Sequence, residues 1–140
     1  MNLKNTENFR ERLAQLREAL FQLHKALVDS ERVSYEQNIG TIPSANHFLQ
    51  LLTNDPWFAW LHPLSQLIVT LDEALDARAK TPLTTEAAAA LVKQTREMLV
   101  ASEASEGFAR HYFDALQRDP DVVMAHAAAA QIFRSTNKAA

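Results

Sequence analysis

Five histidines are the side chains from which metal or acid–base chemistry would start: His24, His47, His62, His111 and His126. Helical bundles that bind two iron ions place a glutamate three positions before a histidine, so that both side chains project from one face. The residues at that position are Phe21, Ser44, Ala59, Phe108 and Val123. None is acidic, and no histidine is followed four positions later by another histidine or a carboxylate. The spacing therefore predicts no metal site, and the pair His111 and Asp114 is expected on a helix surface.

Nucleophilic and phosphate-binding chemistry also lack their usual sequence patterns. The chain has no cysteine and no Gly-x-Ser-x-Gly motif, two common sources of a catalytic nucleophile. Its only glycines, Gly40 and Gly107, are far apart and form no glycine-rich loop of the kind that binds phosphates. We therefore expect no catalytic residues, no cofactor and no enzymatic activity. An enzyme whose carboxylates and histidines converge only in the fold stays open as an alternative.

The charge pattern argues against nucleic acid and lipid as partners. The formal net charge is −3, and arginines near the start alternate with acidic residues, as in Arg10, Glu11 and Arg12. Such mixing is typical of a solvated helix, whereas nucleic-acid binding needs an excess of basic side chains. The longest fully apolar run, residues 57–61, is far shorter than the roughly 20 residues that span a bilayer. With no apolar stretch after Met1, we expect a cytoplasmic protein without nucleic-acid or membrane partners.

The elements that must position these side chains are helices. Only two of 140 residues are glycine, and no Asn-Gly or Asp-Gly pair is present. Tight hairpin turns need such residues, whereas the abundant alanine, leucine, glutamate, glutamine and arginine favour helices. We therefore predict an all-α fold: a single domain over residues 1–140, built as an antiparallel bundle of four main helices. Pro63 and Pro120 are expected to interrupt two of them.

Local signals predict where these helices begin and end. The first and longest is expected from about residue 5 or 6 to Asn38, with Gly40 as its stop. Further helices are expected to begin after capping residues, and the one that begins near residue 84 is expected to end between residues 102 and 107. The expected capping residues are Ser44, Asp55 before Pro56, and Asp119 before Pro120, and the remaining helix is expected to start near Thr84 or Thr85.

The first helix carries an apolar stripe with alternating spacings of four and three: Phe9, Leu13, Leu16, Leu20, Leu23 and Leu27. This heptad pattern has two interpretations, ordinary core packing or an interface with a second copy or another helical protein. A helix of this length spans about 50 Å, more than any other uninterrupted segment. We therefore expect part of the stripe to lie beyond the other helices. Protein–protein association, as a homodimer through this stripe, is the leading functional hypothesis.

The segment from Trp57 to Leu75 is the most apolar part of the chain and is expected at the centre of the bundle. Trp57 and Trp60 lie close to His62 and to the irregularity at Pro63. One interpretation is a core cluster, with an indole N–H bonded to a backbone carbonyl. The alternative is a small-molecule pocket of a regulatory module, formed by Trp57, Trp60, His62 and Tyr112.

Two segments, DPWFAWLHPLSQLIVTLDEAL and RDPDVVMAHAAAAQ, carry a family resemblance. They resemble segments of small all-helical bacterial proteins that belong to uncharacterised families. The resemblance covers about a third of the chain and contains no catalytic motif. It implies a bacterial cytoplasmic origin and no particular activity, so no site residue is transferred from it.

Overall fold

The computed structural model describes residues 3–79 and 81–138, with side chains for residues 8–79 and 81–134. Six α-helices and one 3-10 helix follow each other along the chain, and the described residues contain no strand. The all-α prediction is therefore confirmed. The elements are α1 (Leu3–Asn38), α2 (Ala45–Asn54), η1 (Pro56–Leu61), α3 (His62–Leu75), α4 (Thr85–Met98), α5 (Phe108–Arg118) and α6 (Pro120–Lys138).

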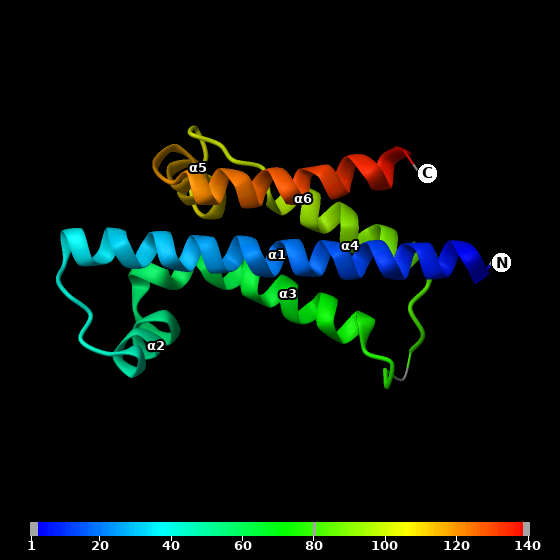
Figure 1. Cartoon of the computed structure of the whole chain (residues 1–140), viewed down its shortest axis with the longest axis horizontal. Helices are drawn as coiled ribbons and strands as arrows, with labels where there is room; N and C mark the ends of the chain where they lie inside the picture. Colours follow the sequence, from blue (N-terminus) through cyan, green and yellow to red (C-terminus); the bar gives the residue numbers. More distant parts are fainter. Residues whose placement is uncertain (1–2, 80, 139–140) are drawn as a thin grey trace.

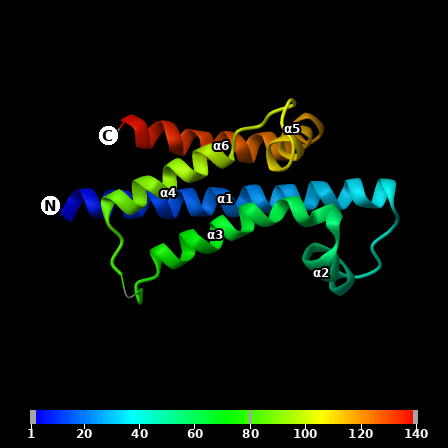
Figure 2. The same cartoon turned by 180° about the vertical axis from the view of Figure 1, so that it is seen from behind.

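Helix α1 is the central element of the bundle, and α3 and α6 pack on opposite sides of it (Figure 1). Helix α4 crosses α1 on the face seen in Figure 2, and η1 and α5 also contact α1. In both views α1 runs in one direction, and α3 and α6 run in the other. The prediction that residues 57–75 form the central element is wrong. Helix α3 contacts α1, α4 and η1 but leaves one side exposed, including Val69.

The leucines of the heptad stripe form the centre of the core within the single chain. Leu13, Leu16, Leu20, Leu23 and Leu27 have no exposed surface, and Phe9 packs half-buried against the same core. Shorter helices cover the stripe because several of them, on different sides, contact the same long helix. In this fold the five leucines present no surface to a second copy. Of the two interpretations of the stripe, core packing is the one that fits their position.

The capping signals mark where the helices begin. The Ser44 hydroxyl accepts a hydrogen bond from the His47 N–H, and the Thr84 hydroxyl accepts one from the Ala87 N–H. The Asp55 carboxylate accepts a hydrogen bond from the Trp57 N–H, with Pro56 in the first position of η1. Each of these bonds satisfies an N–H group that has no partner within its helix.

Two predicted boundaries differ from the structure. Helix α4 ends at Met98 rather than between residues 102 and 107, and an irregular segment then leads to Gly107. Gly107 has a φ of 70°, a backbone conformation that glycine adopts without strain. Pro63 is expected either to kink its helix or to divide it into two. The structure shows η1 passing directly into α3 at His62, so Pro63 lies in the first turn, where its missing N–H costs no hydrogen bond.

A partly buried polar contact joins α1 to the end of α5. Arg118 Nη2 donates to Glu31 Oε1 over 2.6 Å, and Arg118 Nε donates to Ser30 Oγ over 3.0 Å. Glu31 is only 5% exposed and Ser30 is also buried. This contact explains why the apolar stripe of α1 gives way to polar residues after Leu27.

Candidate functional site

The structure does not bring the four residues of the predicted pocket together. Trp57 packs edge-on against Tyr35 of α1, with ring centroids 5.7 Å apart. Trp60 lies on the other side of η1, where it stacks on His111 of α5 at 5.2 Å. The ring of Tyr112 is joined to Trp60 only through Phe108. His62 is exposed at the start of α3 and contributes to neither aromatic group.

The aromatic group that contains Trp60 connects η1, α5 and α6. Its members in spatial order are His111, Trp60, Phe108, Tyr112 and His126. Offset and tilted ring pairs of this kind contribute about 0.5–1.5 kcal/mol each beyond the area they bury. The core interpretation therefore fits the packing of Trp60. Its hydrogen-bond part is wrong, because the buried Nε1 atoms of Trp57 and Trp60 have no partner among the described residues.

One hydrogen bond ends this aromatic group. Tyr112 Oη lies 2.5 Å from Nδ1 of His126. Burial raises the pKa of the Tyr112 phenol and lowers the pKa of His126, so both side chains are neutral at pH 7. A neutral phenol donates and a neutral imidazole nitrogen accepts, which makes this a stable structural contact. It leaves no free acid–base pair.

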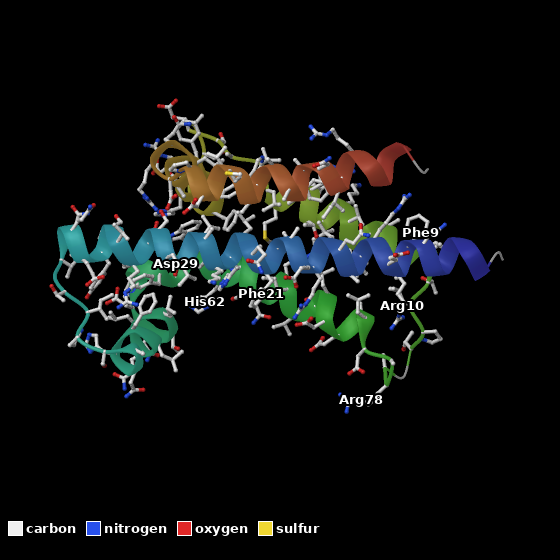
Figure 3. All side chains as sticks on the ribbon, in the orientation of Figure 1. Phe9, Arg10, Phe21, Asp29, His62 and Arg78 are labelled. Carbon is white, nitrogen blue, oxygen red and sulfur yellow. The ribbon has the colours of Figure 1, made fainter. Side chains whose placement is uncertain are left out.

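A small cavity lies instead between α1, α2, η1 and α3. Its volume is about 180 Å³. The apolar side chains that line it are Val28, Leu52, Phe58 and Leu61, and the polar ones are His24, Thr53, His62 and Ser65. Of the predicted pocket residues, only His62 lines this cavity. Figure 3 shows His62 on the side of α1 where α2 and α3 lie, with Phe21 of α1 nearby in the same view.

His24 is the cavity residue that sequence reasoning missed. It follows the core residue Leu23 on α1 and lies beside the buried stripe, where it lines the cavity together with residues of α2, η1 and α3. Burial lowers the pKa of His24, so the imidazole is neutral at pH 7. The ring makes no hydrogen bond to any other described residue. A histidine directly beside a heptad stripe is the sequence signal that could have identified it.

An ion pair sets the position of α3 against this side of α1. Arg17 Nε donates to the Asp72 carboxylate over 2.6 Å. Because α1 and α3 run in opposite directions, residues after Arg17 face residues before Asp72. Phe21 and His24 of α1 thereby approach the part of α3 that contains Ser65 and Val69.

Helix α2 closes the other end of the cavity but packs incompletely on the bundle. Half of its ten residues are apolar, yet none is fully buried. Its main contact is with η1, and it projects away from the axis of α1 (Figure 1). Leu49 is 61% exposed, while Phe48, Leu51 and Leu52 are half-buried.

The described surface also has wider grooves without a defined chemistry, and two of them lie near the α5–α6 connection and the α4–α5 connection. One, of about 240 Å³ between α1 and α6, contains Lys25, Asp29, Asp119 and Asp121. The other, of about 500 Å³, lies beside the irregular segment between α4 and α5. Among the side chains described, those of residues 8–79 and 81–134, no three histidine or acidic groups lie together so that they could hold a metal ion.

The chain was compared with protein-family models, curated proteins and solved structures, and none of these comparisons gives a match. The resemblance to small bacterial helical proteins therefore stays a prediction. In the part of the chain that the structure describes, no helix combines the length and apolar composition needed to cross a bilayer. The geometry of the cavity and of α2 is accordingly the basis for inferring function.

Proposed function

We propose that this protein acts by association with a second copy of itself, through the face where α2 stands away from the bundle. The observation that carries this proposal is the incomplete packing of α2. A helix with five apolar residues out of ten and no fully buried side chain leaves apolar area unused in the single chain. Burial of such area in an interface gives the same free-energy gain that burial in the core gives.

Exposed apolar side chains surround the cavity on three helices. Leu49 lies three residues before Leu52, on the same side of α2, and is 61% exposed. Phe21 lies three residues before His24 on α1 and is 46% exposed, and Val69 lies four residues after Ser65 on α3 and is 48% exposed. Residues three and four positions apart lie on one helix face. We name Phe21, Leu49 and Val69 the α2 face.

The total surface of the chain supports association. A compact monomer of 15.7 kDa is expected to expose about 7,300 Å². The chain exposes 8745 Å², about 1,400 Å² more. A standard interface buries about 800 Å² on each partner. The additional surface is therefore large enough to supply one such interface.

The charge of the chain does not oppose pairing of two copies. A net charge of −3 gives only weak repulsion between like subunits at physiological ionic strength. The interface residues differ from those of the sequence hypothesis, because the leucines of the stripe are enclosed in the core. The proposal includes no catalytic step, and the resemblance to small bacterial helical proteins supports a location in the bacterial cytoplasm.

Sedimentation equilibrium over a range of concentrations tests the proposal. The wild-type chain is expected to form a dimer, and Leu49→Glu is expected to raise the dimer dissociation constant at least about tenfold, because a charge enters the apolar contact. Met124→Glu is the matched control, since Met124 is 72% exposed on α6, away from the α2 face. The control is expected to leave the dissociation constant unchanged.

Two results would contradict the proposal. A wild-type chain that stays monomeric at every concentration removes it. Equal weakening by Leu49→Glu and Met124→Glu places the interface elsewhere. Circular dichroism of each variant shows whether the helices are retained, so that a loss of dimer is not confused with a loss of fold.

A further inference from the structure

We propose that the cavity between α1, α2, η1 and α3 binds a single uncharged aromatic ring that carries one hydrogen-bonding substituent, as in a phenol. This inference goes beyond the proposed association and does not depend on it, because one chain supplies every residue that lines the cavity. Its support comes from three observations: the volume, the absence of aspartate, glutamate, lysine and arginine from the lining, and two imidazole rings without a hydrogen-bond partner among the described residues, of which the ring of His24 is the more buried.

The volume fits one six-membered ring. The cavity measures about 180 Å³. A cavity of about 150 Å³ with apolar walls is known to hold benzene in a protein interior. Pockets for drug-sized ligands measure about 300–1,000 Å³, so this cavity covers a single ring better than a two-ring metabolite or a nucleotide. The ring of Phe58 and the side chains of Val28, Leu52 and Leu61 supply the apolar walls.

The lining contains no aspartate, glutamate, lysine or arginine. A charged ligand would lose its hydration there without gaining a counter-charge, which is costly. Burial lowers the pKa of His24, so its ring does not supply that charge at pH 7. The site therefore favours an uncharged molecule.

The hydrogen bonds inside the cavity leave the imidazole rings of His24 and His62 free for the ligand, and His24 is the more buried of the two. The Thr53 hydroxyl already donates to the Leu49 carbonyl over 2.9 Å, and the Ser65 hydroxyl donates to the His62 carbonyl over 3.1 Å. His24 makes no hydrogen bond to any other described residue. A neutral imidazole offers one donor and one acceptor. A hydroxyl on the bound ring complements either of them.

Titration with phenol, followed by NMR of the backbone amides and of the imidazole nitrogens, tests this proposal. Phenol at millimolar concentrations is expected to shift resonances from α1, α2, η1 and α3 in a saturable way, including those of the His24 ring. Toluene has the same ring without the hydroxyl and is expected to bind about two- to tenfold more weakly, the difference made by one net hydrogen bond. Benzoate, which is charged, is expected not to bind.

Variants assign the contact to His24. His24→Leu keeps an apolar wall but removes the polar group, so phenol and toluene are expected to bind this variant equally. His47→Leu is the matched control, because His47 is an exposed histidine of α2 that does not line the cavity. It is expected to keep the preference for phenol.

A second variant keeps the proposal testable if His24→Leu fails to fold. Val28→Phe places a ring from the chain itself in the cavity and is expected to abolish binding of both probes. The proposal is overturned if phenol gives no saturable shift, if benzoate binds as tightly as phenol, or if His24→Leu retains the full preference for phenol. It is also overturned if Val28→Phe binds phenol as the wild type does.

Discussion

The leucines of the α1 stripe and those of α2 differ in burial within the same chain. Between Leu13 and Leu27, every leucine of the stripe is fully buried, whereas α2 contains three leucines and buries none of them fully. Both helices have an apolar face, so composition does not explain the difference. The cause is geometry: α1 contacts five other elements, while α2 packs mainly on the short η1.

This difference shows that one part of the molecule can stabilise the fold while another part binds partners. Side chains enclosed on all sides stabilise the fold and cannot contact a partner. Side chains that the fold leaves half-covered contribute little to stability and are free to bind. The stripe therefore holds the bundle together, and the face around α2 and the cavity is where we infer association and ligand binding.

Paired alanine substitutions on the two helices should show the largest contrast. Leu20→Ala is expected to lower the free energy of unfolding by about 2–5 kcal/mol, because it removes buried methyl groups and leaves a cavity in the core. Leu49→Ala is expected to lower it by less than about 0.5 kcal/mol, because the side chain is largely exposed.

Urea denaturation followed by circular dichroism measures both values. If Leu49→Ala lowers the free energy of unfolding as much as Leu20→Ala does, the contrast between the enclosed stripe and the half-covered α2 is wrong. The measurement should be made at a protein concentration where the chain is monomeric, since dissociation of a dimer would add to the apparent cost of Leu49→Ala.

A smaller effect is expected where α5 meets α1. Arg118→Met removes the partner of Glu31, which is 5% exposed, and is expected to lower the free energy of unfolding by about 1–3 kcal/mol. The double variant Glu31→Leu with Arg118→Met is expected to recover most of this loss, because no buried charge is left unpaired.

Arg110→Met on the same helix is the control for this cycle. It breaks the exposed pair with Asp114 and the exposed hydrogen bond to the Glu103 carbonyl, and an exposed pair at this spacing is worth about 0.3–0.5 kcal/mol. If Arg118→Met costs no more than Arg110→Met, the buried contact does not distinguish the packed end of α1 from an ordinary helix surface.

The sequence predicts the helices better than their contacts. Ser44, Asp55 and Thr84 mark helix starts because a cap acts on its own backbone within a few residues. The direction in which a helix leaves its connection is not local. The apolar residues of residues 45–54 predict an amphipathic helix, but they do not say that the helix projects from the bundle.

The candidate site was predictable only in part, for the same reason. His62 was selected because it lies beside two tryptophans, yet those tryptophans pack on other elements. His24 lies 38 positions from His62 in the chain, and only the packing of α3 on α1 places both at one cavity. The predicted overhang of α1 has the same explanation. Helix length alone does not reveal that several shorter helices together pack along one long helix.

The smallest expected effect is a dependence of stability on pH. One histidine at the cavity and one on the packed side of the bundle contribute to it. Burial lowers the pKa of His24, at the cavity, and of His126, beside Tyr112 on the packed side. As the pH falls below about 6.5, the unfolded chain takes up protons on these histidines before the folded chain does. Stability is therefore complete above that pH and is lost as the pH falls toward the lowered folded-state pKa values.

The melting temperature measured between pH 7.5 and pH 5.5 is expected to fall for the wild-type chain, and less steeply for His24→Leu, which removes one of the two lowered pKa values. His47→Leu is the matched control, because His47 is an exposed histidine that does not line the cavity. An identical slope in all three proteins would show that the ring of His24 takes up its proton as readily in the folded as in the unfolded chain. In that case the cavity would be open enough to hydrate the ring, and the contrast between an enclosed stripe and a half-covered face would extend to His24 itself.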